Sequence, residues 1–326
     1  KHGIKLVLGY TVEGFKEKDN GVEVLLKDNP SLQADMVVLA IGVTPDTVLA
    51  KEAGLELGIK ESIVVNDRME TSVPDIYAAG DAVQVKHYVT GNDALISLAG
   101  PANKQGRIIA DNICGGDSRY LGSQGSSVIK VFDMTAATTG INETNAKKSG
   151  LEVDTVILSP MSHAGYYPGG KVMTMKVIFE KESYRLLGAQ IIGYEGVDKR
   201  IDVLATAIHA GLKATQLKDL DLAYAPPYSS AKDPVNMAGF MIDNIAKGTL
   251  KQWHLEDMDK ISKDKSVVLL DVRTVGEFNR GHMDGFKNIP VDELRERINE
   301  IKKGKHVYLI CQSGLRSYIA SRILEG

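Results

Sequence analysis

Hydrophobic and polar positions follow two different periods along the chain, and this alternation predicts several mixed α/β modules. Continuous apolar runs predict buried strands at 36–41, 267–270 and 306–310. Further strand-like runs lie at 4–10, 21–26, 63–65, 128–132, 153–159, 171–179 and 187–192. Helical spacing predicts helices at 48–53, 99–113, 142–149, 197–210, 235–245, 291–301 and 317–326.

Length and composition indicate a multidomain protein of ordinary soluble character. The chain has 326 residues, 43% of them hydrophobic, with a net charge of -3 and a pI near 6.2. The chain has no surplus of basic residues, so nothing in its charge favours nucleic acid as a partner. No apolar run reaches the roughly 18 residues that span a bilayer, and no signal peptide is recognisable, so we expect a cytoplasmic protein that does not bind membranes. The histidines show no metal-ligand spacing.

Two cysteines occur in dissimilar contexts, so a disulfide framework is not expected. Cys114 lies between an apolar residue and two glycines and is predicted to be a small buried residue. Cys311 lies between a predicted buried strand and a helix, in the run CQSGLRS. Successive backbone N–H groups can surround the sulfur there, and the start of the helix favours a thiolate. Cys311 is therefore predicted to be a nucleophile toward sulfane sulfur, with Arg316 nearby to hold an anionic donor.

The motifs around Cys311 resemble the ordered signature of single-domain rhodaneses. They comprise LDVR at 270–273, EF at 277–278, GH at 281–282, NIP at 288–290 and the cysteine loop. The resemblance implies that Cys311 accepts sulfur and that Arg316 binds anions and orders the loop. It also implies that Asp271, Arg273 and Glu277 support the loop from beneath. An inactive rhodanese fold or a phosphatase-like loop is the alternative.

A second constellation lies in the first third of the chain, in the string TSVPDIYAAGDA at 71–82. Gly80-Asp81-Ala82 brings a carboxylate to the end of an apolar run, with a helix start to follow. The string resembles the second FAD fingerprint of two-dinucleotide-binding-domain flavoproteins, in which the matching Asp bonds the ribityl chain. Gly42 resembles the crossover to the FAD domain. The helix with Ala99, Pro101 and Lys104 is expected to lie against the flavin.

The module at 127–245 has the pattern of an α+β domain with a mainly antiparallel sheet. It resembles the dimerisation domain of the same superfamily, and the string AYAPPYSSAKDP at 223–234 is similar to coenzyme A-disulfide reductases and their rhodanese-fused relatives. In those enzymes, tyrosines of this domain reach the partner subunit's active site. Tyr224 and Tyr228, together with Tyr166 or Tyr167, are therefore candidate proton donors. Packing at an interface is the alternative for each of them. His209 is expected in a core or an interface.

The resemblance implies a fold class of α/β and α+β domains in series. We expect the end of an NAD(P)H-binding domain at 1–43, the second part of an FAD domain at 44–118, a dimerisation domain at 119–247 and a rhodanese-like domain at 248–326. It also implies FAD, NADH or NADPH, coenzyme A as substrate or ligand, and a homodimer. The glycine-rich fingerprints and the redox cysteine of the family do not occur here, so the chain is expected to be an N-terminally truncated piece with an incomplete rhodanese domain.

Three functions remain open from the sequence. The first is an FAD-dependent reductase of coenzyme A disulfides, persulfides or polysulfides with rhodanese sulfur transfer. The second is an NADH oxidase or peroxidase of the same superfamily, which has no need of Cys311. The third is a sulfurtransferase or sulfur-carrier module on a dimeric flavoprotein scaffold.

Overall fold

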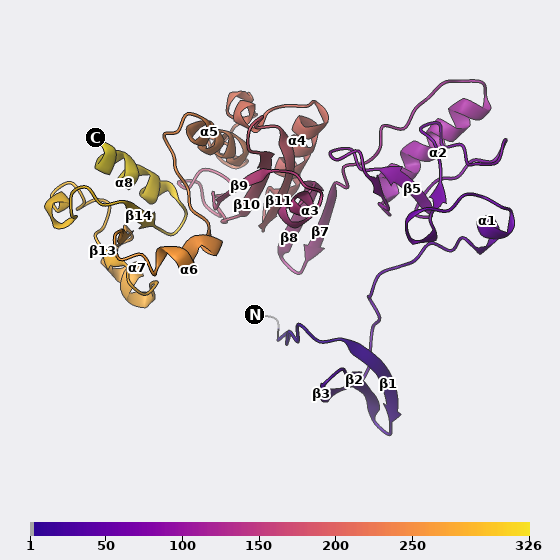
Figure 1. Ribbon diagram of the computed structural model, residues 1–326, viewed down its shortest axis with the longest axis horizontal. Helices are drawn as coiled ribbons and strands as arrows, with labels where there is room; N and C mark the ends of the chain where they lie inside the picture. Colours follow the sequence, from indigo (N-terminus) through magenta and orange to yellow (C-terminus); the bar gives the residue numbers. More distant parts are fainter. Residues whose placement is uncertain (1–2) are drawn as a thin grey trace. The chain divides into compact units, whose positions relative to one another are not determined.

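The computed structural model describes residues 3–326, and these form two compact units. The first unit ends at Asp46 and the second begins at Thr47 (Figure 1).

The first unit is built around a three-stranded antiparallel sheet, β1 (Val12–Lys18), β2 (Gly21–Leu26) and β3 (Asn29–Ala34), in that order. The prediction for 21–26 is confirmed, whereas the strands predicted at 4–10 and 36–41 are wrong. The described residues of this unit supply no neighbouring strand that pairs with either run, and a strand needs such a partner for its N–H and C=O groups. Leu6 and Val38 are each 75% exposed, so apolar character alone did not decide the structure.

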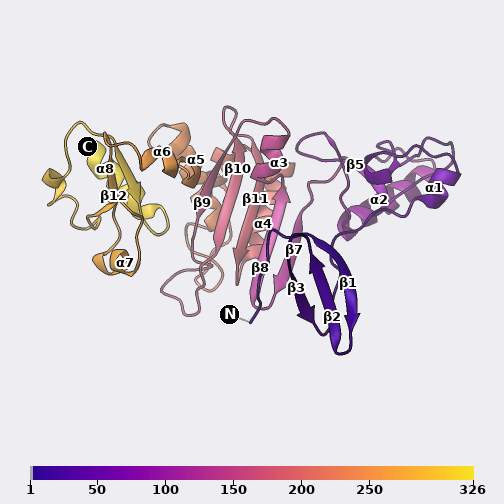
Figure 2. The same ribbon diagram turned by 60° about the horizontal axis from the view of Figure 1, so that its bottom comes forward.

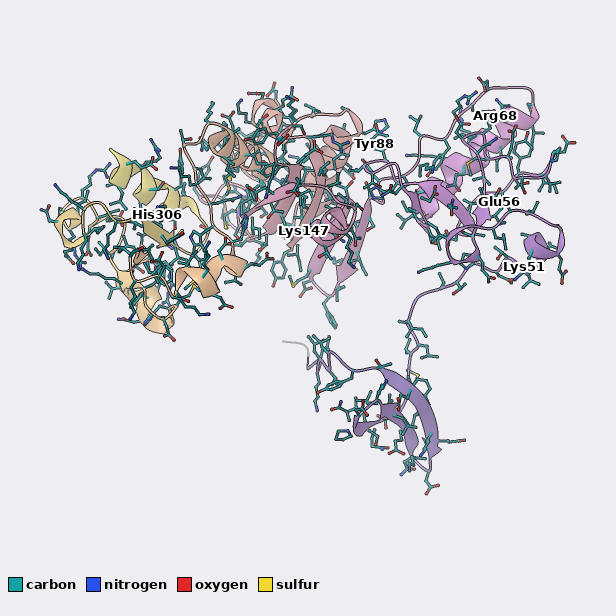
Figure 3. All side chains as sticks on the ribbon, in the orientation of Figure 1. Lys51, Glu56, Arg68, Tyr88, Lys147 and His306 are labelled. Atoms are coloured by element: carbon teal, nitrogen blue, oxygen red, sulfur yellow. The ribbon has the colours of Figure 1, made fainter. Side chains whose placement is uncertain are left out.

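The second unit opens with a small α/β part containing α1 (Val48–Glu52), β4 (Ile63–Val64), β5 (Val83–Lys86), β6 (Asp93–Ala94) and α2 (Ala99–Ile113). The three strands form one sheet in the order given, and α2 packs its Ile108 against the core of Met69, Val83 and Val85. Arg68, labelled in Figure 3, bonds Glu70, Asp117 and the carbonyl of Gly116 beyond the end of α2.

The prediction that Cys114 is buried is wrong, because Cys114 is exposed. It is the residue that ends α2, and its neighbour Ile113 is 64% exposed. The apolar face of the helix has turned away from the core by this point, so a small apolar side chain gains no burial there.

The centre of the second unit is a five-stranded antiparallel sheet in the order β7-β8-β11-β10-β9. Its strands are β7 (Ser127–Val131), β8 (Met134–Gly140), β9 (Val153–Leu158), β10 (Thr174–Glu180) and β11 (Leu186–Gly193), and its helices are α3 (Glu143–Lys148), α4 (Val197–His209) and α5 (Pro234–Ala246). Helix α4 packs on β8 and β11, and α5 packs on β9 (Figures 1 and 2). Strand β8 was missed because its run of Thr and Ala lacks large apolar residues.

The last part has a parallel sheet in the order β13-β12-β14, which comprises β12 (Val268–Asp271), β13 (Lys287–Asn288) and β14 (Val307–Ile310). Its helices are α6 (Met258–Ile261), α7 (Val275–Arg280) and α8 (Leu315–Glu325). Leu270, Ile289, Leu294 and Ala320 form its core. Asp271 and Ile310 are aligned, so the residues that follow β12 and β14 leave the sheet at the same edge.

The amphipathic helix predicted at 291–301 is wrong. The segment makes successive turns with i to i−3 hydrogen bonds, and it contains a 3-10 turn at Ile298–Glu300. Arg297 bonds both Glu293 and Glu300, and Leu294 is fully buried. The segment therefore packs through separate apolar residues, with Leu294 buried and Val291 and Ile301 partly buried against the same core, and not through a helical face.

The segment between α5 and α6 is tied to the parts before and after it. Gln252 donates to the carbonyl of Thr155 in β9 at 2.9 Å, and Trp253 Nε1 donates to the carbonyl of Leu309 in β14 at 3.2 Å. His254 Nε2 lies 3.0 Å from Asp154 Oδ1. The linker is thus hydrogen-bonded on both sides rather than free.

Candidate functional site

Cys311 follows β14 directly and lies in the turn that leads into α8. The backbone N–H groups of Gly314 and Ser317 point at its Sγ atom from 3.1 Å and 3.4 Å. Gly314 has φ 94°, a left-handed conformation that glycine adopts without strain and that closes the turn around the sulfur. The strand-turn-helix expected from the sequence is therefore present, with the sulfur inside a ring of donors.

These donors change the ionisation of the thiol. Burial by itself raises the pKa of Cys311, but the side chain of Ser317 and the backbone N–H groups of Ser317, Ser313 and Gly314 outweigh it. The net result is a pKa below the ordinary value of a cysteine thiol. A larger fraction of thiolate is therefore present near neutral pH, and the thiolate is the nucleophilic form.

The hydroxyl oxygen of Ser317 is buried, and it has no well-aligned hydrogen-bond partner within the part of the chain that the structure describes. A hydroxyl hydrogen rotates freely about the C–O bond. The Ser317 proton can therefore turn toward the sulfur, or toward an atom that the sulfur carries. Sequence reasoning did not single out this residue, although its place at the start of a helix after the cysteine was visible.

Arg316 does not point freely into solvent, because it forms two parallel hydrogen bonds with Glu277 in α7, at 2.7 Å and 2.8 Å. Glu277 also accepts bonds from the hydroxyl and the N–H of Thr274. The guanidinium of Arg316, with these Thr274 donors, holds the pKa of Glu277 far below its usual range. This arrangement joins the start of α8 to α7 and suits the loop-ordering role predicted for Arg316.

A second ion pair lies at the end of β12. Arg273 bonds both carboxylate oxygens of Asp271, which is 1% exposed, and donates to the carbonyl of Gly281 at 2.9 Å. Asn288 donates to the carbonyls of Asp271 and Arg273. These contacts hold the chain after β12 beside the cysteine loop, in keeping with the supporting role expected for these residues.

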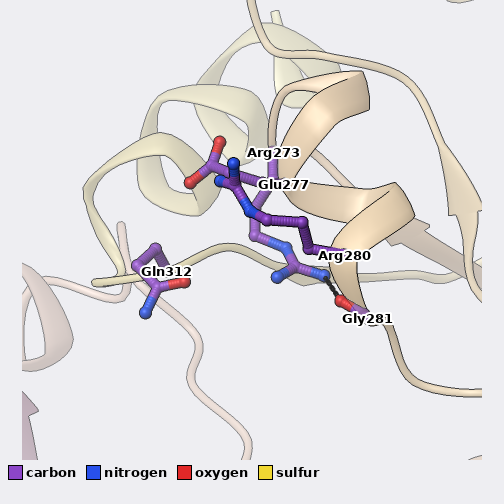
Figure 4. Close-up of a pocket in the computed structure, with 5 residues that line it drawn as sticks. All are labelled: Arg273, Glu277, Arg280, Gly281 and Gln312. Atoms are coloured by element: carbon purple, nitrogen blue, oxygen red, sulfur yellow. Dashed lines mark hydrogen bonds between the residues drawn. The ribbon is translucent and has the colours of Figure 1, made fainter.

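A cavity of about 410 Å³ opens beside the loop (Figure 4). Its lining residues are Arg273, Glu277, Arg280, Gly281 and Gln312. Gln312 directly follows Cys311, so the cavity reaches the start of the cysteine loop.

The candidate tyrosines lie on two loops of the central part. The hydroxyls of Tyr166 and Tyr224 are 2.6 Å apart, although the residues are far apart in sequence. The hydrogen bond between Tyr224 and Tyr166 raises the pKa of Tyr224 above its ordinary value, so the phenol stays protonated around neutrality. Tyr167 contacts His163 edge to face at 5.6 Å, and Tyr228 is 72% exposed. The structure thus brings one of the expected pairs together.

One buried cation organises both tyrosine loops, and the sequence analysis missed it. Arg200 in α4 is 1% exposed and forms an ion pair with Asp233 at 2.9 Å. Its guanidinium also donates to the carbonyl of Ser162 and to the carbonyl of Tyr228. The signal was present in the sequence, because Arg200 occupies the apolar face of α4 one residue before the buried Ile201.

Among the expected flavin-binding residues, Gly80 is hydrogen-bonded to α2. The N–H of Gly80 donates to the buried Gln105 Oε1 at 2.7 Å, and Gly80 has φ 87°. Asp81 is exposed, and the carbonyl of Ala82 accepts from the N–H of Ile63. Gly42 belongs to the first unit.

Helix α2 starts at Ala99 without a side-chain cap, so no capping side chain competes with a ligand for the N–H groups at its start. Pro101 and Lys104 line a cavity of about 500 Å³ beside it.

His209, expected in a core or an interface, is exposed at the end of α4. Its ring stacks on Tyr88 at 5.1 Å, and its carbonyl accepts from the Tyr88 hydroxyl.

Over residues 3–326, no cluster of His, Cys, Asp and Glu is arranged to hold a metal ion. Over the same residues, no helix combines the length and the apolar character needed to cross a bilayer.

Three family models match successive parts of the chain. Residues 1–106 match the pyridine nucleotide-disulphide oxidoreductases, residues 126–234 match the dimerisation domain of that family, and residues 254–326 match the rhodanese-like domain.

Individual proteins match over both halves of the chain. The NAD(P)H sulfur oxidoreductase (CoA-dependent) of Pyrococcus abyssi is 37% identical over 235 residues, which is 72% of this chain and 52% of the relative. The crystal structure of reduced CoADR-RHD of Bacillus anthracis has a TM-score of 0.93 and 47% identity, covering 97% of this chain and 56% of that one. An NAD-dependent persulfide reductase from A. fulgidus has a TM-score of 0.88 and 41% identity, covering 97% and 57%.

The chain spans about half the length of the curated relatives that it matches. The three family matches follow one another in the order of the three parts of the fold, and the cysteine loop lies in the last of them. The chain therefore belongs to the pyridine nucleotide-disulphide oxidoreductases, which depend on FAD and NAD(P)H, and it carries a rhodanese-like domain after the dimerisation domain of that family.

Proposed function

We propose that the chain acts within an NAD(P)H-dependent flavoprotein that reduces coenzyme A disulfides, persulfides or polysulfides, and that Cys311 transfers sulfane sulfur. The observation that carries this proposal is the cradle of N–H groups around Cys311, in a chain whose other parts match a disulfide reductase family. The NAD(P)H sulfur oxidoreductase and the persulfide reductase among its relatives support the choice of sulfur chemistry.

The proposed transfer step needs only the thiolate. Cys311 Sγ attacks the outer sulfur of a persulfide R–S–SH, the S–S bond breaks, and R–S⁻ leaves while Cys311 becomes a persulfide. No external oxidant or reductant is required, because one persulfide is cleaved and another forms on Cys311. The N–H groups of Gly314 and Ser317 stabilise negative charge on the sulfur before and after the step.

The residues around α2 fit a bound flavin nucleotide. Gly80 leaves open space where a side chain would stand, the carboxylate of Asp81 is exposed, and the first turn of α2 has uncapped N–H groups beside the cavity that Pro101 and Lys104 line. Asp81 would hold a ribityl hydroxyl, and the α2 N-terminus, which begins at Ala99, would receive a polar edge of the ring system. FAD, when bound, would carry electrons from NADH or NADPH toward the disulfide.

The tyrosine pair would serve the leaving thiolate of coenzyme A. A phenol that remains protonated around neutrality can donate a hydrogen bond or a proton to a thiolate. Tyr224, held by Tyr166, is the stronger candidate, while the more exposed Tyr228 and the ring of Tyr167 flank it on the same loops. We further propose that these residues act across a homodimer, which sedimentation of the protein would test.

The experiment that tests the function uses the natural full-length protein under anaerobic conditions with NADH and coenzyme A persulfide. NADH absorbance and sulfide release are followed together. Equal NADH loss and sulfide formation are expected. NADH loss that begins only when oxygen is admitted would overturn the proposal in favour of an NADH oxidase.

A Cys311→Ser variant separates the two activities. We expect it to lose sulfur transfer and to keep NADH-dependent reduction of coenzyme A disulfide. Cys114→Ser is the matched control, because Cys114 is exposed at the end of α2 and belongs to no proposed site. Sulfur transfer unchanged in Cys311→Ser would exclude a role for the loop.

A further inference from the structure

We propose that Arg280 is the residue that selects the sulfur donor of Cys311, by binding a sulfonate or phosphate group of the donor in the cavity beside the loop. This inference rests on the proposed sulfur transfer and deepens it, because it names the chemical class of the donor. It assigns to Arg280 the anion binding that the sequence suggested for Arg316.

The charges that line the cavity single out Arg280. Arg273 is neutralised by the buried carboxylate of Asp271, and Glu277 is neutralised by Arg316. Gln312 and Gly281 are uncharged. Arg280 makes no ion pair with any residue in the described part of the chain, so the cavity carries about one uncompensated positive charge.

Arg316 is poorly suited to the task because both of its terminal nitrogens are engaged by Glu277, at 2.7 Å and 2.8 Å. If Arg316 bound the anionic group of a sulfur donor instead, the carboxylate of Glu277 would lose its partner. Arg280 follows Glu277 by three residues on α7, so both side chains lie on one helix face. Figure 4 shows the side chains of Arg280 and Arg273 on one side of the cavity, with Gln312 apart from them on the other.

The fold places this charge at the same edge of the sheet as the nucleophile. Strands β12 and β14 are parallel neighbours, and the N–H of Val272 donates to the carbonyl of Ile310 at 3.0 Å. Arg273 and Cys311 each follow directly from that pair, so the cavity opens at the edge of the sheet where Cys311 lies. On this proposal, a donor whose oxyanion contacts Arg280 directs its sulfane sulfur toward Sγ at that edge.

Two classes of donor share the required oxyanion. In thiosulfate, Cys311 thiolate takes the outer sulfur and sulfite leaves, so the step is balanced in atoms and charge. In coenzyme A persulfide, the phosphates supply the oxyanion and the coenzyme A thiolate leaves. Pantetheine persulfide carries the same reacting group as coenzyme A persulfide but no phosphate, and it serves as the neutral comparison.

Binding of radiolabelled thiosulfate is measured by equilibrium dialysis. The protein is the full chain with the Cys311→Ser substitution, which cannot accept sulfur. Adding Arg280→Gln should weaken thiosulfate binding about ten-fold, since a hydrogen bond to a charged group contributes about that factor. Arg280→Lys should retain part of the affinity. Arg295→Gln is the matched control, because Arg295 is exposed in the same domain and does not line the cavity.

The kinetic arm measures sulfur loading of Cys311 by mass in the protein that retains the cysteine. Arg280→Gln should raise the KM for thiosulfate, for coenzyme A persulfide or for both about ten-fold, with kcat changed less than about two-fold. The donor that responds identifies the oxyanion. Loading by pantetheine persulfide should not change.

The outcomes separate the two proposals. Unchanged binding and unchanged KM for both anionic donors would overturn the role of Arg280 and leave sulfur transfer intact. An equal loss with pantetheine persulfide would show that Arg280 supports the loop and does not select the donor. If no donor transfers sulfur to Cys311, the proposed function is wrong. The dialysis experiment would still show whether Arg280 binds the anion.

Discussion

Ser317 approaches Cys311 with two groups. Its backbone N–H lies 3.4 Å from Sγ, and its buried hydroxyl oxygen has no hydrogen-bond partner among the residues described. The hydroxyl hydrogen can turn toward the sulfur, and the Ser317 side chain is one of the groups that lower the pKa of the Cys311 thiol. The pKa of the nucleophile therefore depends in part on the Ser317 side chain at the start of α8.

Replacing Ser317 with Ala should raise the pKa of Cys311, because one of the groups that stabilise the thiolate is removed. Thiolate forms as the pH rises through this pKa, so the profile of alkylation rate against pH should move to higher pH. Iodoacetamide trapping followed by mass spectrometry measures it, in a Cys114→Ala background because Cys114 is exposed. Ser313→Ala is the control, since Ser313 acts through its backbone N–H and should leave the profile in place.

Arg200→Met should destabilise the central part of the protein by about 3–5 kcal/mol, because it leaves the buried carboxylate of Asp233 without its partner. The urea midpoint of unfolding measures the loss. Lys199→Met is the matched control, since Lys199 lies 3.9 Å from the same carboxylate but is partly exposed, and its loss should cost less than about 1 kcal/mol. Similar costs for both variants would contradict the importance of the buried pair.

The linker contact between His254 and Asp154 should make stability depend on pH. The hydrogen bond with Asp154 raises the pKa of His254 above 6.5, and this outweighs the opposing effect of burial. The stabilisation is therefore fully present below the unfolded pKa and is lost as the pH rises through the higher folded pKa. Tm should fall more steeply in wild type than in His254→Gln as the pH rises through this range. Parallel curves would mean that the ion pair does not stabilise the fold.

Two glycines of the rhodanese-like part should respond in opposite directions to replacement by alanine. Gly314 has φ 94°, so Gly314→Ala should cost about 1–2 kcal/mol and loosen the N–H contact with Cys311. Gly276 lies inside α7 with open space around it, so Gly276→Ala should stabilise by about 0.5–1 kcal/mol. Thermal unfolding of both variants checks the signs. A neutral Gly314→Ala would show that the turn tolerates another conformation.

Local patterns in the sequence were enough to locate the nucleophile. A buried strand, a glycine-containing turn and a helix in succession place Cys311 against backbone donors, whatever the rest of the molecule does, because the contacts span six residues or fewer. The same holds for α4, whose apolar face repeats over three turns. The strand β8 was not predicted because its sequence carries little periodic signal, whereas 291–301 has helical spacing and nevertheless folds into successive turns.

Only the tertiary structure decided which charges and hydroxyls meet. Arg316 with Glu277, Tyr166 with Tyr224 and Arg200 with Asp233 are separated by 39, 58 and 33 positions, and no local pattern encodes such pairs. Apolar runs also failed to predict strands at 4–10 and 36–41, because a strand forms through hydrogen bonds to a neighbour that its own residues do not specify. The sequence by itself therefore determined the nucleophile and its cradle. The packing of separate elements decided that Arg316 is paired with Glu277 and that Arg280 has no ion pair among residues 3–326, because the partner of a charged side chain depends on which elements lie beside it.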